Sequence, residues 1–283
     1  GYLMYCPKGP WLEWDDEGAA RAFLRGAAEA AARLGAHTLK IEPEVREGRG
    51  GQKALLEELG FRKFRWDINH RSTMVVDLSR PEEDLLAGMK GKTRYNVRLS
   101  ARKGVRVAED GSPAAEEAFW RMHKETVERQ EFWSRPYSYY RAALRAMREA
   151  GRAHLFFAEH EGDRLAAVLV YTFGHKCLYM LGATSREKRN LMPASLLQWE
   201  VMRWAKGRGL THYDMWGIPT PEKRNEDHPL YGVYKFKAGF GGEVEDFVGS
   251  LDLPIERVRA GLWDKTEPTY YRIYQRLKGD VYY

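Results

Sequence analysis

The first part of the chain alternates short apolar runs with one long amphipathic segment. Residues 2–10 have the apolar pattern of a strand, and Asp15 or Asp16 can cap a long helix, rich in Ala, Leu and Arg, that Gly35 ends. Residues 37–45 then have the pattern of a buried strand. Together these segments predict a β-α-β unit.

The next segment completes a first domain. A polar, glycine-rich loop at residues 47–51 leads into a short helix at 52–60. Residues 61–69 and 72–78 alternate between polar and apolar positions like strands. We expect the first domain to close near residue 79.

One helix with a basic second half is predicted between Pro81 and Gly104. Proline is tolerated in the first turn of a helix, and the acidic residues after Pro81 favour the positive end of the helix dipole. Gly104 ends this helix, and residues 104–110 form a strand. The cations suit a phosphate-rich partner, although a solvated charged face would carry the same residues. They are Lys90, Lys92, Arg94, Arg98 and Arg102.

The remaining elements follow the order of a known fold. They are a strand at 104–110, helices at 113–128 and 137–150, strands at 154–162, 165–174 and 175–185, a helix at 193–207 and a strand at 211–218. This β-α-α-β-β-β-α-β order is that of the N-acetyltransferase type of acyltransferase fold. In that fold a mixed sheet splits where the acyl donor enters.

The predicted fold class is therefore α/β (α+β), with mixed central sheets flanked by helices. The first domain covers residues 1–79 and the second covers residues 80–254, and a loosely shared order of elements favours two related domains. Residues 255–283 are helical in part and pack back on the first domain. Because the chain starts at Gly1 and enters a strand at once, we expect that N-terminal sequence is missing.

Composition narrows the class of protein. The chain has 283 residues, of which 43% are apolar, so it can form large cores, and its net charge of +6 suggests affinity for anions without establishing it. Cys6 and Cys177 have no zinc-binding spacing and fit a reducing cytoplasm, although a single disulfide between them stays open. The longest apolar run, residues 165–173, is far shorter than the roughly 20 residues of a membrane span. We expect a cytoplasmic protein, with at most peripheral membrane contact.

No metal or covalent chemistry is indicated by the motifs. The eight histidines lack the spacing of metal ligands, and the chain has no P-loop and no CxxC pair. No Ser-His-Asp order stands out either. We therefore expect neither a metal site nor a covalent intermediate.

Six segments, in order along the chain, resemble the FemABX family of peptidoglycan peptidyltransferases. They are KTRYNVRLSARKGV, RPYSYY, YMLGATS, RNLMPASLLQWEVMRWAKGRG, YDMWGI and YGVYKFKAGFGGEV. The resemblance spans nearly the whole chain and implies a FemX-like aminoacyltransferase with two tandem acetyltransferase-like (GNAT) domains. Members move an amino acid from aminoacyl-tRNA to the side-chain amine of the third stem-peptide residue of a UDP-linked or lipid-linked muropeptide. This reaction builds the interpeptide bridge, needs no cofactor, and would place tRNA along the basic helix.

The resemblance assigns catalysis to a segment near the end of the second domain. Lys237, with Phe236, occupies the position of the lysine that neutralises charge at the reaction centre. Residues 231–242 alternate like a strand, which would place Val233, Lys235 and Lys237 on one face. A lysine that protects a strand edge from aggregation is the structural alternative.

Two carboxylates are further candidates. Glu42 falls where family members often carry an acidic residue that faces the cleft, and it could orient or deprotonate the incoming amine. Asp214 is a similar case, and it could also simply cap a loop.

Precursor binding is assigned to an arginine and two tyrosines. Arg135 and Tyr139 lie one helical turn apart, which suits a diphosphate held by a guanidinium and a phenol. Both resemble the precursor-binding pair of the family, and Tyr179 resembles a further substrate-binding tyrosine. An ordinary helix start and a core aromatic residue are the alternative readings.

Two other functions stay open from the sequence. One is a coenzyme A-dependent acetyltransferase-like enzyme acting on a small amine. The loop SREKRNLMPASLL argues against it, because it lacks the glycines with which such enzymes bind a pyrophosphate. The other is an RNA-binding module without catalysis. The sequence leaves open the amino acid transferred, the form of the acceptor and its third stem residue.

Overall fold

The computed structural model describes residues 2–130 and 135–278, which divide into two compact units. The first unit contains residues 1–72 and 245–283, and the second contains residues 73–244. The sequence placed these boundaries at 79/80 and 254/255. The structural limits fall earlier at both places because residues 73–77 pair with a strand of the second unit, whereas residues 251–254 pair with strands of the first.

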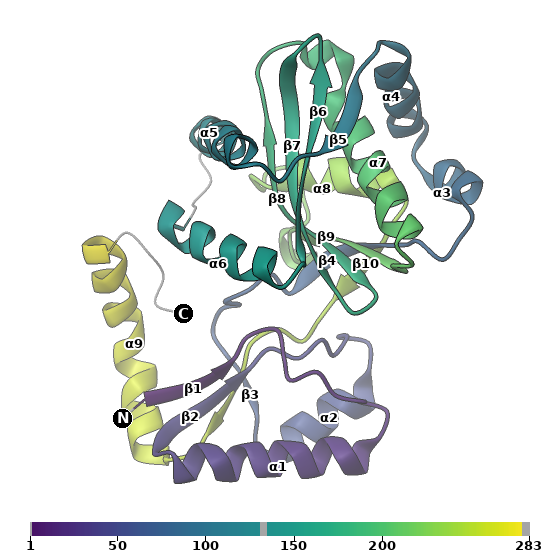
Figure 1. The fold of residues 1–283 in the computed structure, drawn as a ribbon. Coiled ribbons are helices and arrows are strands. Elements are labelled where there is room, and N and C mark those ends of the chain that lie inside the picture. The colour runs from purple at the N-terminus through teal and green to yellow at the C-terminus, as the bar shows by residue number, and fades with distance from the viewer. Residues whose placement is uncertain (1, 131–134, 279–283) are drawn as a thin grey trace. The chain divides into compact units, whose positions relative to one another are not determined.

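The first unit is built on a four-stranded mixed sheet. Its strand order is β1 (Tyr2–Cys6), β2 (Ala36–Ile41), β11 (Leu251–Pro254) and β3 (Arg62–Lys63) (Figure 1). β1 and β2 run parallel and are joined by helix α1 (Glu17–Arg33), which confirms the predicted β-α-β unit. The predicted cap is present, since Asp16 Oδ1 accepts a hydrogen bond of 2.9 Å from the Ala19 N–H.

The strand predicted at residues 61–69 is wrong except for its first part. Only Arg62–Lys63 pairs as a strand. Beyond it, the backbone N–H of Ile68 donates to Ser250 Oγ and that of Asn69 donates to Glu42 Oε1. These donors serve side chains, so they cannot extend the sheet.

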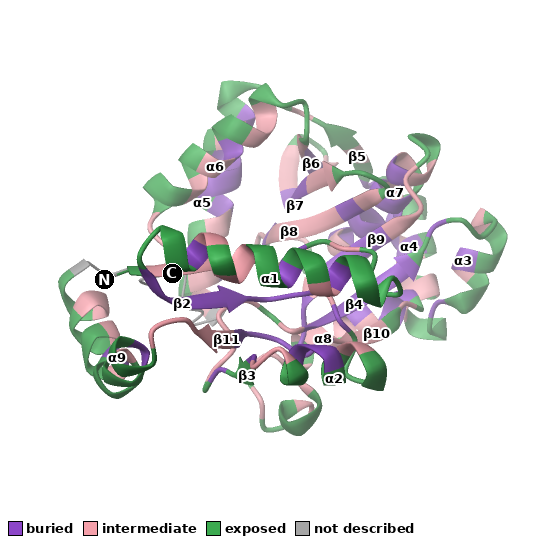
Figure 2. Cartoon of the chain, turned by 90° about the horizontal axis from the view of Figure 1, so that it is seen from below, coloured by how far each residue is buried: buried purple, intermediate pink, exposed green. Residues whose placement is uncertain are grey.

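Helices cover the first sheet, and β2 is buried along its whole length (Figure 2). Both α1 and the C-terminal helix α9 (Arg257–Lys278) contact β2, and α2 (Gly50–Glu58) packs on α1. The predicted helix at 52–60 is therefore confirmed as α2. The predicted return of the C-terminal segment to the first unit agrees with the position of α9.

The second unit is built on a seven-stranded mixed sheet. Its order is β10 (Glu243–Asp246), β4 (Ser72–Asp77), β9 (His212–Gly217), β8 (Lys176–Thr184), β7 (Asp163–Phe173), β6 (Ala153–His160) and β5 (Arg106–Glu109). The chain order from β5 to β9, with α5 (Pro113–Gln130), α6 (Tyr137–Glu149) and α7 (Pro193–Gly207), is the order predicted. Two mixed sheets flanked by helices confirm the predicted fold class.

Alternation along the strands of the second sheet separates two cores. On β6, Phe156 packs into a core that includes residues of α7, whereas its neighbours Leu155 and Phe157 pack into a core with α5 and α6. This two-residue period gives the sheet two apolar faces. Each face is therefore covered by helices, and the sheet is fixed between them.

The single basic helix predicted between Pro81 and Gly104 is wrong, because two helices occupy this segment. They are α3 (Glu82–Gly88) and α4 (Gly91–Arg102). The chain becomes extended at Met89, whose side chain is buried, and the Lys90 N–H donates to Gly239 O at 2.9 Å. Packing against a distant segment thus breaks a helix that local pattern would continue.

Residues 231–242 form helical turns, so the strand predicted there is also wrong. They contain α8 (Tyr231–Lys237) and a 3₁₀ turn at Ala238–Phe240. Residues two apart differ by about 200° around a helix, so Lys235 and Lys237 do not share a face. Lys237 is buried and Lys235 is exposed.

No helix within residues 2–130 and 135–278 is long and apolar enough to cross a bilayer. The apolar run at residues 165–173 lies in β7, in the middle of the second sheet. Its apolar side chains are used in the two cores of that sheet.

Attachment of α9 buries a carboxylate without hydrogen bonds. Glu267 is fully buried, and neither of its oxygens has a hydrogen-bond partner among the described residues. Burial raises the pKa of Glu267 to about 7, against the effect of Lys40 and Arg65, and with a contribution from Asp252 and Asp264. Lys40 on β2 is also fully buried, and its Nζ lies 2.6 Å from Asp252 Oδ1.

We expect Glu267 to make stability depend on pH. Its pKa is about 7 in the folded protein against 4.5 ordinarily, so the free energy of unfolding falls as the pH rises through that window. Glu267→Gln, which cannot ionise, should flatten this fall and be more stable than wild type above it. Urea unfolding at about pH 5 and about pH 8 measures the effect, with the exposed Glu29→Gln as control. An equal loss in Glu267→Gln and wild type would contradict the expectation.

Candidate functional site

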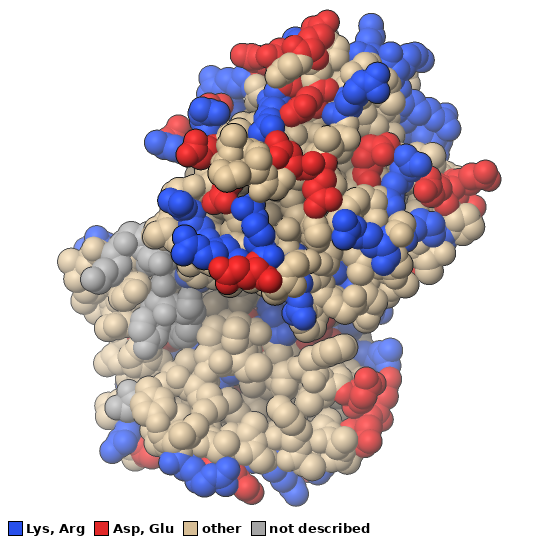
Figure 3. Space-filling model, viewed as in Figure 1, with Lys and Arg blue, Asp and Glu red and all other residues tan. Residues whose placement is uncertain are grey.

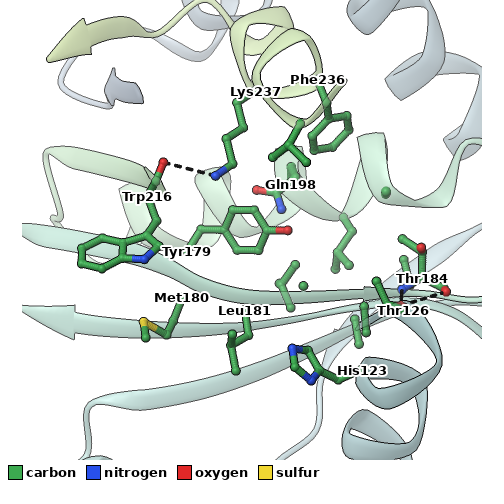
Figure 4. A pocket seen from close by; sticks show the side chains of 18 of the residues that line it. His123, Thr126, Tyr179, Met180, Leu181, Thr184, Gln198, Trp216, Phe236 and Lys237 are labelled. Carbon is green, nitrogen blue, oxygen red and sulfur yellow. Dashed lines mark hydrogen bonds between the residues drawn. The ribbon is translucent and has the colours of Figure 1, made fainter. Parts of the chain in front are cut away.

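A cavity opens in the second unit where β8 and β9 stop pairing. The two strands run parallel but pair only at three positions, from Lys176 with His212 to Leu178 with Asp214. Beyond this point lies a cavity of about 690 Å³, lined by β8, α5, α7 and α8 (Figure 4). The split sheet predicted from the order of elements is thus present.

Lys237 reaches into this cavity from the last turn of α8. Its side chain is buried, and Nζ donates hydrogen bonds to Gly217 O at 2.8 Å and Trp216 O at 3.2 Å. Burial lowers the pKa of Lys237 to about 7, although the nearby Asp214 carboxylate opposes this. Near neutral pH the amine is therefore divided between its charged and neutral forms, as suits a group that exchanges a proton.

The backbone that receives Lys237 is held in an unusual conformation. Trp216 has a φ of +60°, in the left-handed region that favours glycine. Its N–H donates to Asp214 Oδ1 at 2.8 Å, and Asp214 also accepts a hydrogen bond from the Thr73 hydroxyl. The buried Asp214 therefore does cap this turn, and the turn directs two carbonyls at Lys237.

Tyr179 and Phe236 complete the wall around Lys237. The Tyr179 ring centroid lies 5.6 Å from Lys237 Nζ, and burial raises the pKa of its phenol to about 12. The phenol hydroxyl occupies the space that a Cβ at Gly182 would need, so glycine there permits this ring position. Tyr179, Phe236 and Lys237 are thus brought together in one cavity, as Figure 4 shows.

The far side of the cavity is formed by α5. Thr126 on α5 accepts a hydrogen bond of 3.0 Å from the Thr184 N–H at the end of β8 (Figure 4). Arg129, one turn later, donates to Thr184 Oγ1 at 2.8 Å. These bonds fix α5 on the strand that carries Tyr179.

Arg135 lies over the ring of Tyr139 and also lines a second cavity. The guanidinium carbon of Arg135, which precedes α6, lies 4.6 Å from the Tyr139 ring centroid. Arg135 lines a cavity of about 880 Å³ between α5 and α6, with Tyr137, Tyr140 and Arg141. Arg135 thus lines a cavity other than the one that holds Tyr179 and Lys237, and Tyr139 lines neither of the two.

The two cavities share part of their walls. His123 and Val127, both on α5, line the cavity at Lys237 and the cavity at Arg135. The His123 ring stacks on Phe119 with centroids 5.8 Å apart, and burial lowers its pKa. A neutral imidazole therefore borders both cavities.

Glu42 belongs to the first unit and has its oxygens occupied by donors. The bonds come from Tyr5 Oη (2.8 Å), Asn69 Nδ2 (2.6 Å), Asn69 N (3.1 Å) and Ser250 Oγ (2.5 Å). Burial would raise the pKa of Glu42, but the bonds from Ser250, Asn69 and Tyr5 outweigh it and lower the pKa. A carboxylate in this state is a weak base that anchors three segments of the first unit, and it is poorly suited to deprotonate an amine.

Of the five basic residues predicted to contact tRNA, one is bonded to backbone carbonyls and four are exposed. Arg94 donates to Ala87 O at 2.9 Å and to Leu86 O and Met89 O at 3.3 Å, so it closes the C-terminal end of α3. The other candidates, Lys90, Lys92, Arg98 and Arg102, are exposed. Figure 3 shows Lys and Arg gathered over α4, with Asp and Glu over α3.

Sequence reasoning missed two residues of this site, Gln198 and Trp216. Gln198 is a buried polar residue on the apolar face of α7, and a polar residue within an apolar helical stripe is a signal that can be read from sequence. The left-handed backbone of Trp216 has no such signal. Among the described residues, no group of three or more His, Cys, Asp or Glu is placed to hold a metal ion.

Comparison with known proteins places the chain in a family. A model of the FemAB family matches residues 60–161 and 145–265 of the chain. The chain belongs to the FemAB family. The crystal structure of a protein named FemX superposes on this FemAB protein with a TM-score of 0.83 at 23% sequence identity, over 93% of this chain and 83% of that one. The expected resemblance is thus confirmed.

Two curated relatives carry a functional name. A lipid II:glycine glycyltransferase of Staphylococcus epidermidis is 23% identical over 350 residues, covering 98% of this chain and 83% of the relative. One of Staphylococcus aureus is 24% identical over 340 residues, covering 94% and 80%. These names state that both relatives transfer glycine to lipid II.

We expect the Lys237 amine to titrate far below an ordinary lysine. In NMR spectra of protein with ¹³C-labelled lysine, the Cε signal of Lys237 should have a midpoint near pH 7, against about 10.4 for a lysine in a model peptide. This signal should be missing in Lys237→Met and present in Lys235→Met. Asp214→Asn should lower its midpoint further, because it removes the anion that favours the charged amine. A Lys237 signal that titrates near pH 10 would contradict the lowered pKa.

Proposed function

We propose that this FemAB protein transfers an aminoacyl group from aminoacyl-tRNA to an amine of a peptidoglycan precursor. The observation that carries the proposal is the buried Lys237, with its lowered pKa, in the cavity where β8 and β9 part. Family membership and the glycyltransferase names of two relatives support acyl transfer as the reaction. The proposal makes the acceptor the side-chain amine of the third stem-peptide residue.

The reaction needs little from the protein besides position and charge stabilisation. An aminoacyl ester is already activated, and attack by a neutral amine forms the C–N bond while the carbonyl oxygen gains negative charge. The ester C–O bond then breaks, the attacking nitrogen loses one proton, and the ribose oxygen leaves with one. Lys237 is the residue that supplies positive charge or a proton at this centre.

Precursor binding is proposed at Arg135 and Tyr139, beside the second cavity. The stacked Arg135 and Tyr139 would hold the diphosphate of the precursor, because a guanidinium binds phosphate oxygens with a fork of donors. Tyr179 would contact the part of the acceptor that reaches Lys237, since both line the same cavity. The names of the relatives favour a lipid-linked precursor, which the protein would approach from the cytoplasmic side of the membrane.

Binding of tRNA is proposed on α4. Lys90, Lys92, Arg98 and Arg102 present exposed cations there, as phosphate contacts require. The structure gives Arg94 a second task, the capping of α3, so its loss would also disturb the helix pair.

Incubation with charged tRNAs and a precursor tests the proposed reaction. Wild-type protein, a set of charged tRNAs and either the UDP-linked or the lipid-linked muropeptide should give a precursor heavier by one amino acid in mass spectra. Lys237→Ala, shown to be folded by circular dichroism, should reduce the rate by about 100-fold or more, because it removes the charge at the reaction centre. Lys235→Ala, which removes an exposed lysine of the same helix, is the control. Wild-type transfer in Lys237→Ala would refute the role of this lysine.

The salt dependence of tRNA binding tests the α4 surface. Replacing Arg98 and Arg102 with Gln should weaken binding and lower the slope of log K against log salt by roughly 1 to 2, because phosphate contacts are lost. Replacing Arg25 and Arg33 of α1 with Gln removes the same charge from another exposed helix face and should leave the slope unchanged. An equal effect of both pairs would assign the binding to net charge instead of to α4.

A further inference from the structure

Gln198 is a buried amide in the wall of the Lys237 cavity. It lies on α7 with 2% of its surface exposed, and it is one of the residues that line the cavity. Its Oε1 accepts a hydrogen bond of 2.6 Å from the hydroxyl of Tyr213, a fully buried residue of β9. Its amide nitrogen has no hydrogen-bond partner within the part of the chain that the structure describes.

The hydrogen bond from Tyr213 determines which end of the amide is available. A buried hydroxyl needs an acceptor for its hydrogen, and Gln198 Oε1 supplies it. Reversing the amide would leave the Tyr213 hydrogen without an acceptor, at a cost of about 1–3 kcal/mol. Burial also raises the pKa of Tyr213 well above its ordinary value, so the phenol stays a neutral donor. Gln198 therefore presents its NH₂ group, a pure donor, to the cavity.

Lys237 in its neutral form cannot itself donate a hydrogen bond into the cavity. Figure 4 shows the Gln198 amide on the same side of the cavity as the Lys237 amine and Tyr179. Two donor positions of Lys237 are already directed at the carbonyls of Trp216 and Gly217. A neutral lysine has only two N–H groups, so in that form Lys237 presents a lone pair to the cavity and no donor.

We propose that the side-chain amide of Gln198 donates a hydrogen bond to the carbonyl oxygen of the acyl group, and that Tyr213 positions this amide. The inference rests on the proposed acyl transfer. As the amine nitrogen bonds to the carbonyl carbon, the π electrons move to the oxygen, which then accepts from Gln198 Nε2. When the C–O bond of the ester breaks, those electrons return to the C=O bond, Lys237 takes a proton from the attacking nitrogen, and the ribose oxygen leaves with a proton from Lys237. Gln198 thus stabilises the charged oxygen, while Lys237 exchanges the proton.

Two substitutions of Gln198 separate this donor from the packing of the side chain. Gln198→Glu keeps the acceptor for the Tyr213 hydroxyl but offers an anionic oxygen in place of the NH₂ group. Gln198→Leu replaces the amide with a shorter, apolar side chain and removes both the donor and the acceptor. Tyr213→Phe leaves the amide in place but removes the bond that orients it.

Single-turnover transfer from charged tRNA to saturating precursor is the measurement. Both Gln198 variants should lower the rate constant by about 100-fold, the usual effect of losing one oxyanion donor, with tRNA and precursor affinities within about twofold of wild type. Tyr213→Phe should lose less, by about tenfold, because only the orientation is weakened. The control Gln52→Leu, on α2 in the first unit, should transfer at the wild-type rate.

The outcomes distinguish this inference from the proposed function. An active wild type with Gln198→Glu at the same rate overturns the inference and leaves acyl transfer intact. A wild type that is inactive with every charged tRNA and both precursors overturns acyl transfer, and the inference with it. A loss in affinity with an unchanged rate constant also overturns the inference, because it assigns Gln198 to binding alone.

NMR spectroscopy of the wild-type protein tests the inference even if the variants do not fold. The ¹⁵N side-chain amide signals of Gln198 in wild-type protein are assigned through their contacts with Tyr213. The probe is 3′-deoxy-3′-glycylamino-adenosine, an amide that resembles the acylated end of tRNA and resists transfer. Saturation with the probe should shift these signals downfield, and unchanged signals under saturation would overturn the inference.

Discussion

The short pairing between β8 and β9 is the constraint on which the second unit depends. A parallel ladder that continued along both strands would satisfy their backbone groups and close the sheet over its core. Here the ladder ends at Leu178 and Asp214, and the sheet opens into a cavity. Tyr179 is the first residue after the ladder on one strand, and the carbonyls of Trp216 and Gly217 accept from Lys237 on the other. The cavity, with the side chains that line it, is thus a consequence of where the ladder ends.

The chemistry of the cavity comes from locally unfavourable choices that the surrounding structure holds in place. Burying the Lys237 amine disfavours its charge, and two carbonyls and a nearby carboxylate offset this only in part. A left-handed conformation at Trp216 costs about 1–2 kcal/mol for a residue with a side chain. Asp214, bonded to the Trp216 N–H and the Thr73 hydroxyl, keeps that conformation in place. Such costs are expected where a protein positions a reactive group.

Sequence patterns predicted the helices and strands whose apolar positions repeat over many residues. They failed for segments whose conformation is determined by a contact with a distant part of the chain. Helix α7 has the predicted bounds because its buried face repeats over four turns, and the strands of the second sheet follow their alternation. The strand predicted at residues 231–242 is wrong because α8 has only seven residues. Over so short a segment, the apolar and polar positions fit the two-residue period of a strand as well as the 3.6-residue period of a helix. The break at Met89 depends on a bond to Gly239 that local sequence does not contain. The family resemblance pointed to Lys237, Phe236 and Tyr179, which line the cavity. The orientation of the Gln198 amide, in contrast, follows only from its hydrogen bond with Tyr213.

The position of His123 has a thermodynamic consequence. Its ring forms part of the wall of both cavities, so a ligand that displaces it in one cavity changes the shape of the other. Two ligands that act on one shared side chain have linked binding free energies, and the linkage is equal in both directions. Because burial lowers the pKa of His123, the shared group is neutral near physiological pH, and the linkage operates through shape and contact instead of through charge. The free energy of binding in one cavity therefore depends on whether the other cavity is occupied.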